Sequence, residues 1–351
     1  MPQASPTSGS PRILIVRLSA LGDVIHGLPV ACALSAAIPD ATIGWVVEGR
    51  NADLIAGHSA IDHIIRAPRG WLKSPSAVFS LRRQLRALKF DVTVDLQCLT
   101  KSAIAAWLSG AKRRIGKAGA HGHELSKWFH NELVAIEAEH VIDHYLDMLR
   151  PLGIESPRVR FDLPEEDADA DMAEHLMRSH RMVPRRFAIL NPGAGWNSKI
   201  WPPERYGEVA RRLLTDFGMP SLAVWGIPEE QPLAESIVAA SRGAAKLAPS
   251  TTVPQLASLC RRAALFLGSD TGPMHLAVAV GTPTISLHGP SRAEWCGAYG
   301  RYNIRLQARY EDGSSIERRQ ADDSAMRAIS IDMAYGACRE LLDRSPLRRC
   351  G

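Results

Sequence analysis

A single carboxylate, Asp23, stands in the stretch SALGDVIHGLP, between an apolar run that ends at Val16 and a long helix-forming run. Gly22, directly before it, lets the backbone approach a ligand closely because glycine has no Cβ. A carboxylate at this place can act as a general base for an attacking hydroxyl group. It can equally well cap the following helix and complement its dipole. The position alone leaves both interpretations open.

A second candidate is the glycine-rich stretch NPGAGWNSKIWP, residues 191–202, which follows another apolar run. Lys199 is the only cation in this loop, and WPPERY then begins a helix with proline near its first position. Flexible backbone, one lysine and a helix start together suit a phosphate group. The stretch is no Walker A loop, since GxxxxGK[ST] is absent. A solvated lysine on a surface loop is the plainer alternative.

A third candidate is the segment GSDTGPMHLAVAVGTP, residues 268–283, which follows the apolar run ALFL. Asp270, Thr271 and Gly272 form a polar turn that opens a helix. The free N–H groups of a helix start favour an anion such as a diphosphate, and Asp270 would then orient backbone groups. His275 lies one helical turn further on. A lone helical histidine is usually structural, but this one is at the same end of the helix as the turn.

The stretch WGIPEEQ places two carboxylates, Glu229 and Glu230, after a further apolar run. An acid at a strand end can accept hydrogen bonds from the hydroxyl pair of a ribose. A solvated helix start explains the same residues equally well. Taken together, the four segments predict an acid in the first half of the chain and an anion site in the second half.

Short apolar runs precede each of these segments, and longer amphipathic runs such as 76–89 separate them. This alternation predicts parallel sheets covered by helices on both faces. Ligands of open sheets bind at the carboxyl ends of the strands, so we expect the site there, in a cleft between two domains. The expected strands are 12–16, 42–47, 63–67 and 91–96 in the first half, and 187–192, 221–226, 264–269 and 282–289 in the second.

The stretch GIESPRVRFDLPEEDADAD, residues 153–171, interrupts this alternation with proline and acidic residues. It fits an interdomain linker that enters a helix. The first eleven residues have neither a basic nor an apolar leader region, which predicts a disordered tail. The expected organisation is therefore a tail at 1–11, an N-terminal domain at 12–160 and a C-terminal domain at 161–351.

The composition is that of an ordinary globular protein of 351 residues, 46% hydrophobic and 23% charged, with a formal net charge of +5. This mild positive charge permits an acidic partner but selects none. No two of the six cysteines have metal-ligand spacing, and Cys32, Cys98 and Cys260 stand in apolar runs, as small core residues do. No apolar run reaches the roughly 18 residues that span a bilayer. We expect a cytoplasmic protein without structural zinc and without a transmembrane segment.

Four stretches, ILIVRLSALGDVIHGLP, DLQCLTKS, NPGAGWNSKIWP and GSDTGPMHLAVAVGTPTISLHGP, resemble the ADP-heptose:lipopolysaccharide heptosyltransferases of glycosyltransferase family 9. The resemblance runs from Arg12 to about Tyr299, and the joint occurrence of GDxxHxLP and SDTGxxHLA is specific for that family. It implies the α/β fold called GT-B, two Rossmann-like domains whose parallel sheets face a central cleft. It also implies inverting transfer of a heptose from ADP-heptose to the lipopolysaccharide inner core, without a cofactor or a metal.

The resemblance implies that Asp23 is the catalytic base, in an acceptor-binding N-terminal domain. Lys199 matches the phosphate-binding lysine, and Glu230, with Glu229 as a near alternative, matches the acid on the ribose. The donor site implied in this way comprises Gly22, Lys199, Glu230, Asp270, Thr271, Gly272 and His275. A single displacement needs the base and the leaving group on opposite faces of the sugar, hence on opposite domains. The nucleotide-sugar site therefore falls to the C-terminal domain.

The implied acceptor is an acidic glycolipid at the inner membrane, and nucleic acid is not expected as a partner. Acceptor contacts fall on Arg69, Lys73, His140 and His144. There the chain, with PRGWLK and EHVIDHYL, has fewer arginines than the first-heptose enzyme, which leaves the acceptor and the heptose added open. Two basic runs, 80–89 and 111–117, could contact anionic headgroups at the membrane surface. The first is more simply the exposed face of an amphipathic helix.

Other functions remain to be weighed. A GT-B transferase for a different nucleotide sugar would use the same residues. A degenerate homologue that only binds a nucleotide or glycan would also resemble this chain, but the presence of both Asp23 and Lys199 argues against it. A nicotinamide oxidoreductase would need GxGxxG after the first strand, which is missing. A metal-dependent transferase would hold its diphosphate through a DxD motif. The DxD-like run here, Asp167, Asp169 and Asp171, lies in the linker and fits a solvated helix start better.

Overall fold

A computed structural model describes residues 10–49, 51–119 and 125–344. The chain divides into two compact units, residues 1–164 and 165–351, which we call the N-terminal and C-terminal units. The boundary expected from the sequence, 160/161, lies four residues earlier. The tail expected at 1–11 lies outside the described residues except for its last two positions.

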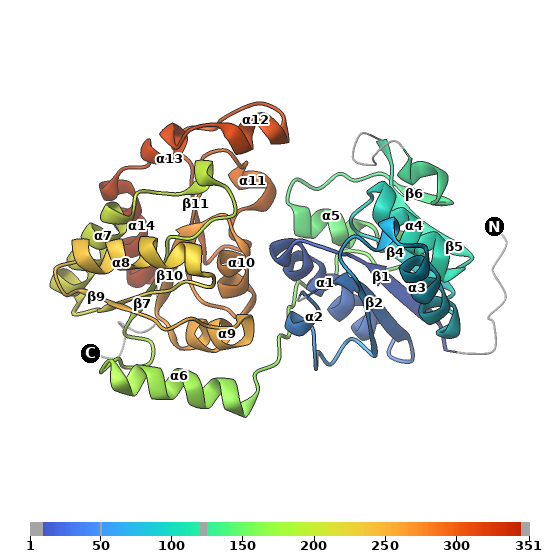
Figure 1. The fold of residues 1–351 in the computed structure, drawn as a ribbon, viewed down its shortest axis with the longest axis horizontal. Coiled ribbons are helices and arrows are strands. Elements are labelled where there is room, and N and C mark those ends of the chain that lie inside the picture. The colour runs from blue at the N-terminus through green and yellow to red at the C-terminus, as the bar shows by residue number, and fades with distance from the viewer. Residues whose placement is uncertain (1–9, 50, 120–124, 345–351) are drawn as a thin grey trace. The chain divides into compact units, whose positions relative to one another are not determined.

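The N-terminal unit is built on a six-stranded parallel sheet in the order β3-β2-β1-β4-β5-β6 (Figure 1). Its central strands are short runs of β-branched and leucine residues, which favour a strand that is buried on both faces. The strands are β1 (Arg12–Val16), β2 (Thr42–Glu48), β3 (His63–Ala67), β4 (Val92–Asp95), β5 (Arg113–Lys117) and β6 (Glu132–Val134).

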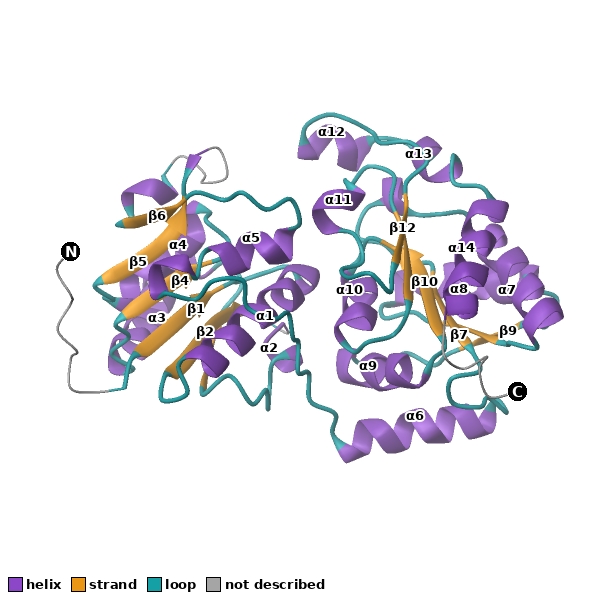
Figure 2. Ribbon diagram, turned by 180° about the vertical axis from the view of Figure 1, so that it is seen from behind, coloured by secondary structure: helices purple, strands orange, loops and turns teal. Residues whose placement is uncertain are grey.

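Helices cover both faces of this sheet (Figure 2). Leu81 and Leu85 of one helix pack with Leu14 and Val16 of β1 and with Ala105, and each such fully buried leucine contributes roughly 1.5–3 kcal/mol. The helices of the unit are α1 (Leu21–Ala37), α2 (Asn51–Leu54), α3 (Pro75–Ala87), α4 (Thr100–Ser109) and α5 (Val141–Asp147), with short 3-10 turns η1 (Trp71–Lys73), η3 (Ser126–Trp128) and η4 (Arg150–Leu152).

The C-terminal unit repeats this architecture with the order β12-β11-β10-β7-β8-β9. Counted within each unit, both sheets have the strand order 3-2-1-4-5-6 of a Rossmann fold. The strands are β7 (Ala188–Asn191), β8 (Ser221–Ala223), β9 (Ala245–Leu247), β10 (Leu265–Ser269), β11 (Thr284–Leu287) and β12 (Ile304–Leu306).

One face of the second sheet is covered by the helices that contribute Tyr206, Ile237 and Cys338 to a continuous apolar core. The helices of the unit are α6 (Asp167–Ser179), α7 (Pro203–Phe217), α8 (Gln231–Ala240), α9 (Val253–Arg262), α10 (Gly272–Ala279), α11 (Ala293–Cys296), α12 (Ser315–Gln320), α13 (Ser324–Arg327) and α14 (Ile331–Arg344), with 3-10 turns η5 (Asn197–Lys199) and η6 (Pro228–Glu230).

One sequence interpretation is wrong. The second basic run, 111–117, is not a surface run for headgroups, because it forms β5 inside the sheet. Arg113 of this strand donates to both carboxylate oxygens of Glu132 on β6, at 2.7 and 2.8 Å. Lys117 is only 7% exposed. The strand could not be recognised in the sequence because its charged residues break the apolar pattern that identifies the other strands.

Two other expectations are confirmed. Cys32, Cys98 and Cys260 are buried. The DxD-like run opens a helix, because α6 begins at Asp167 and its first-turn carboxylates complement the helix dipole. Among the helices that the structure describes, none is long and apolar enough to cross a membrane.

Candidate functional site

Each sheet reverses its strand order next to its first strand, where β1 lies beside β4 and β7 lies beside β10. The loops that leave two such strands diverge, which opens a crevice at their carboxyl ends. Asp23 follows β1, Lys199 follows β7 and Asp270 follows β10. These three residues therefore lie at the switch point of one sheet or the other.

In the N-terminal unit, Asp23 is the third residue of α1 and its side chain is 38% exposed. Its Oδ2 atom accepts the backbone N–H of Ala20 at 3.1 Å and lies 2.5 Å from Nη2 of Arg17. The helix-start role is thus real. This role leaves the other oxygen, Oδ1, available, because both contacts engage Oδ2.

Arg17 follows β1 directly and is 8% exposed, and Lys117 ends β5 and is 7% exposed. Both cations lie at the ring of Tyr145, with the Arg17 Cζ 5.6 Å and the Lys117 Nζ 4.7 Å from its centroid. Burial and the charge of Arg17 lower the pKa of Lys117. This switch point thus gathers two cations around the Asp23 carboxylate, an arrangement that suits an acidic ligand.

Beneath these residues, the end of β4 carries a fully buried carboxylate, Asp95. Its oxygens accept the backbone N–H groups of Gln97 and Cys98 at 3.0 Å and the Ser102 hydroxyl at 2.9 Å, and His130 Nε2 lies 3.1 Å away. Every lone pair has a partner, so Asp95 fixes the loop that begins α4. A second buried acid, Glu48 at the end of β2, forms an ion pair with Lys101.

The residues expected to contact the acceptor fall into two groups. Arg69 and Lys73 are exposed on the loop and 3-10 turn after β3. His140 and His144 are buried at α5, and His140 Nδ1 accepts the N–H of Ile142 as a helix cap at 3.2 Å. The cap is a structural role for His140, and the exposed pair, Arg69 and Lys73, are the more accessible candidates for contact with an acceptor.

In the C-terminal unit, Lys199 is not the solvated lysine of the plainer interpretation. Its Nζ lies 2.6 Å from Asp270 Oδ2 and 4.5 Å from the centre of the Trp196 ring. His275 Nε2 lies 3.1 Å from the other carboxylate oxygen, Oδ1. Burial alone would raise the pKa of Asp270, but Lys199 and His275 outweigh it and hold that pKa well below its ordinary value. The carboxylate thus fixes the lysine at the start of α10.

Glu230 lies over the glycine-rich loop that follows β7. Its Oε2 atom accepts the N–H of Gly226 at 2.9 Å, and a Cβ atom at position 193 would come within 2.3 Å of its Oε1. Gly193 therefore leaves the space that this carboxylate occupies. Glu229 is exposed, whereas Glu230 is partly buried against the loop, so the geometry favours Glu230 of the two.

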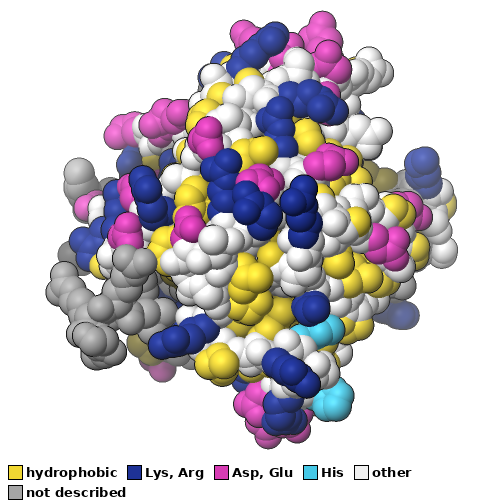
Figure 3. Space-filling model, turned by 90° about the vertical axis from the view of Figure 1, so that its left-hand side faces the viewer, with side chains coloured by type: hydrophobic (Ala, Val, Ile, Leu, Met, Phe, Trp, Pro, Cys, Tyr) yellow, Lys and Arg dark blue, Asp and Glu magenta, His cyan; other side chains and the backbone are white. Residues whose placement is uncertain are grey.

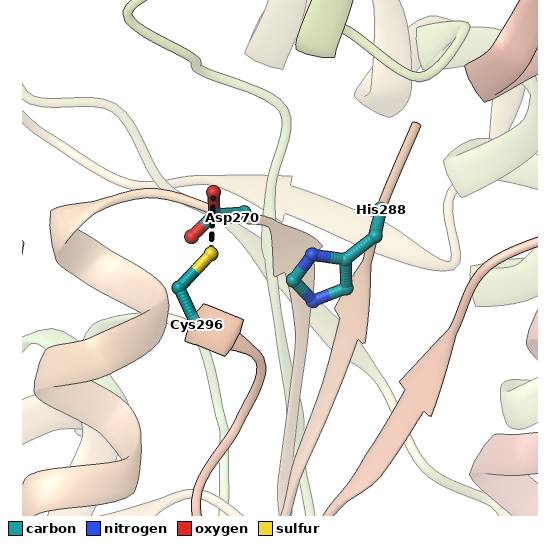
Figure 4. Close-up of side chains that lie close together, drawn as sticks. All are labelled: Asp270, His288 and Cys296. Atoms are coloured by element: carbon teal, nitrogen blue, oxygen red, sulfur yellow. Dashed lines mark hydrogen bonds between the residues drawn. The ribbon is translucent and has the colours of Figure 1, made fainter. Parts of the chain in front are cut away.

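Asp270, His288 and Cys296 bring three potential metal-ligand atoms within 4.8 Å of one another, although they come from three different elements (Figure 4). The Cys296 thiol lies 3.4 Å from Asp270 Oδ2. Other groups already engage this set, because Lys199 pairs with the carboxylate and His288 lies 3.3 and 2.9 Å from the hydroxyls of Ser291 and Ser286. A cation at this position would have to displace the ammonium group of Lys199.

Sequence reasoning missed several of these residues, namely Arg17, Glu48, Asp95, Lys101, Lys117, Tyr145, His288 and Cys296. Five of them stand at the end of a strand or directly after it, namely Arg17, Glu48, Asp95, Lys117 and His288. The rule that ligands bind at carboxyl ends of parallel strands would have pointed to these five. Tyr145 and Cys296 carry no such signal, since their place depends on how distant elements pack.

Two Rossmann-like units with polar switch points define a GT-B glycosyltransferase fold, and comparisons with known proteins support this class. A family model described as glycosyltransferase family 9 (heptosyltransferase) matches residues 78–324. The chain belongs to that family, and it is a glycosyltransferase.

Among similar proteins, the lipopolysaccharide heptosyltransferase 1 of Pseudomonas aeruginosa is 29% identical over 311 residues, 84% of this chain and 83% of the relative. The lipopolysaccharide heptosyltransferase 3 of Escherichia coli is 26% identical over 92% of this chain and 97% of its own length. A family 9 glycosyl transferase from Veillonella parvula superimposes with a TM-score of 0.81 at 23% identity, covering 96% of this chain and 98% of that one. The E. coli heptosyltransferase WaaC with ADP superimposes with a TM-score of 0.73 at 22% identity, covering 96% and 99%.

Proposed function

We propose that this protein transfers a heptose from ADP-heptose to the lipopolysaccharide inner core, with inversion at the anomeric carbon. The relatives named above support the reaction, and a WaaC structure with ADP-2-deoxy-2-fluoro heptose, similar in fold, supports the donor. The observation that carries the proposal is the pair of switch points, one with a half-exposed carboxylate beside two cations and one with a fixed lysine at a helix start.

In the proposed chemistry, a hydroxyl oxygen of the acceptor attacks the anomeric carbon, and the bond from that carbon to the diphosphate oxygen breaks. Asp23 takes the hydroxyl proton. Because Arg17 and the N–H of Ala20 both engage Oδ2, we assign Oδ1 as the proton acceptor.

The C-terminal unit would stabilise the leaving group. Negative charge develops on the diphosphate of ADP as the bond breaks, and Lys199 with the N–H groups of Thr271 and Gly272 at the start of α10 would stabilise it. Asp270 and His275 act by positioning, since they fix the lysine. Glu230 would accept the hydroxyl groups of the ribose.

For the acceptor we propose an acidic glycolipid of the inner membrane. Lys117 is the best-placed cation for one of its acidic groups, since within the described part of the chain no carboxylate lies within ion-pair distance of its ammonium group. Arg69 and Lys73 would contact the acceptor from the exposed loop after β3.

The direct test is release of ADP from ADP-heptose in the presence of a heptose-deficient core acceptor, with ADP-glucose and a reaction without acceptor as controls. We expect release only with ADP-heptose plus acceptor. Turnover of another nucleotide sugar would establish the alternative transferase, and ADP binding without turnover of any donor would establish a degenerate homologue.

We further propose chemistry that is independent of a divalent metal. The ammonium group of Lys199 occupies the carboxylate that a metal would use, which supports this proposal. A chelator should therefore leave turnover within about twofold, since the Lys199 charge replaces a metal at the leaving group. Loss of activity on chelation, with recovery on adding magnesium or manganese, would instead assign Asp270, His288 and Cys296 as ligands.

A further inference from the structure

The N-terminal unit carries large apolar side chains on the outer surface of three neighbouring elements, α3, α4 and η3, which pack side by side. Phe79 of α3 is 67% exposed, Trp107 of α4 is 52% exposed and Trp128 of η3 is 84% exposed. Leu125, directly before η3, is also exposed. Single exposed apolar residues are common on soluble surfaces, but three exposed aromatic rings on adjoining elements are unusual.

The same surface has a strong positive bias. Between Ser76 and Lys89 the chain has four cations, Arg82, Arg83, Arg86 and Lys89, and no acid. The outward face of α3 combines Phe79 with Arg82, Arg83 and Arg86, which line a groove of about 660 Å³ together with Ser76 and Ser80. Helix α3 itself contains no acidic residue.

Two of these arginines have no structural duty that the described residues reveal. Arg86 donates from Nε to the carbonyl oxygen of Leu108 at 3.1 Å and so joins α3 to α4. Within the described part of the chain, neither Arg82 nor Arg83 forms an ion pair with a carboxylate. Their charges are thus available to an external anion.

Another surface of the molecule differs. On the face drawn in Figure 3, basic and acidic side chains are interspersed. Helix α7 is an example, because Arg211 and Arg212 both pair with Glu208 on the same helix. Arg82 and Arg83 beside the exposed ring of Phe79 thus contrast with the paired arginines of α7.

We propose that this surface docks the enzyme on an anionic lipid bilayer. Arginine side chains are attracted to anionic headgroups, and tryptophan and phenylalanine rings settle at the boundary between headgroups and acyl chains. Hydroxyl groups of Ser76 and Ser80 add hydrogen-bond partners for phosphate oxygens in the groove. The surface binds lipid without donor or acceptor, so this inference stands or fails independently of the proposed transferase activity.

The test is co-sedimentation of the full chain with vesicles of phosphatidylcholine mixed with phosphatidylglycerol. We expect binding that weakens as salt is added, and little binding to phosphatidylcholine alone. Inorganic phosphate at matched ionic strength should not displace the protein, because soluble phosphate cannot engage the aromatic rings. Absence of binding to the anionic vesicles would overturn the proposal, and so would binding to a single-stranded oligonucleotide that the vesicles fail to displace.

The double variant Arg82→Gln, Arg83→Gln should bind the anionic vesicles about 25-fold more weakly, since each basic residue near the surface contributes about fivefold. The matched control is Arg178→Gln, Arg327→Gln, which removes the same charge from exposed arginines of α6 and α13. We expect the control to bind like the native chain. Equal losses in both variants would show that net charge alone is responsible, and would overturn the assignment to α3.

The aromatic part of the proposal has its own variant. Trp128→Ala should weaken vesicle binding at high salt, where the electrostatic attraction is screened. The control is Ile316→Ala, which removes a residue of α12 that is 69% exposed. Both variants remove surface side chains and should keep the native melting temperature. If Trp128→Ala binds as tightly as Ile316→Ala at every salt concentration, the aromatic rings do not enter the bilayer.

Discussion

The two switch points use the same pair of charges in opposite ways. At the first, a buried cation, Arg17, holds a carboxylate, Asp23, that is 38% exposed. At the second, a carboxylate that is 7% exposed, Asp270, holds the lysine that would meet the ligand. The more exposed member of the pair is the acid in the N-terminal unit and the cation in the C-terminal unit, where Lys199 is 14% exposed. The same fold can therefore present a base or an anion site, depending on which partner is buried.

This difference separates residues that act on substrate from residues that position them. Asp23 and Lys199 are the members of each pair that the proposed chemistry uses. Arg17 and Asp270 are their supports, and the buried supports carry more of the folding energy because an unpaired buried charge is costly. Substitutions should therefore affect stability and activity differently at the two sites.

The largest loss of stability should come from Asp270→Asn. This change leaves the Lys199 ammonium beside a neutral amide, and breaking a buried ion pair costs about 3–5 kcal/mol. Urea unfolding would measure it, with Asp23→Asn as the matched control. We expect the control to lose about 1 kcal/mol or less, since the carboxylate is more than a third exposed and Asn can still accept from Arg17. Equal losses at both sites would remove the distinction between them.

The expected change in free energy is smaller for Lys199→Ala than for Asp270→Asn. Loss of a charge-assisted contact should weaken ADP binding by about 1.5–3 kcal/mol, roughly 10-fold to 150-fold. The ion pair with Asp270 means that this variant should also be less stable, contrary to the expectation of a lysine without a core role. Calorimetric titration with ADP is the measurement, and Lys246→Ala, an exposed lysine of β9, is the control. Unchanged ADP affinity would show that Lys199 only neutralises Asp270.

A third expectation concerns pH. Burial lowers the pKa of His288 to about 4 from its ordinary value near 6.5. The unfolded chain then binds more protons between these values, so the folded state is favoured above pH 6.5 and loses this advantage as the pH falls towards 4. The free energy of unfolding of the native chain should drop by about 2 kcal/mol between pH 7 and pH 5 from this group alone.

The matched variant for the pH experiment is His288→Gln, which keeps a hydrogen-bonding side chain between Ser286 and Ser291. Its unfolding free energy should vary less with pH over the same window. A native chain and a variant with identical pH profiles would show that His288 does not titrate on unfolding. Asp270 contributes in the same direction only at lower pH, because its depressed pKa is felt below the ordinary value near 4.

Much of the fold could be predicted from the sequence because the apolar runs are strong. Residues 12–16 and 63–67 form β1 and β3 over the whole length expected, and the helix expected at 76–89 is α3, Pro75–Ala87. The strand β5 could not be predicted in this way. It lies in the run 111–117, whose basic residues, four of seven, indicate a surface segment instead. Its place in the sheet comes from pairing with β4 and β6, which no local pattern records.

The site was predictable only in part for a similar reason. Asp23, Lys199 and Asp270 stand beside glycines after strong apolar runs, so sequence position singled them out. The pairing of Lys199 with Asp270 spans 71 residues and depends on β7 lying beside β10. Lys117 reaches the Asp23 site because strand order brings β5 there. Neither of these two contacts can be predicted from the spacing of the residues along the chain.

The proposed mechanism depends most directly on Asp23 as the base, and one measurement tests this role. Asp23→Asn keeps the shape of the side chain and its capping of α1, because Asn and Asp cap about equally well. An amide cannot take the proton, so turnover with ADP-heptose and a heptose-deficient core acceptor should fall roughly 10²-fold to 10⁴-fold. ADP affinity and melting temperature should change little. Turnover near the native value in a folded variant would contradict the account and leave Asp23 as a helix-start residue.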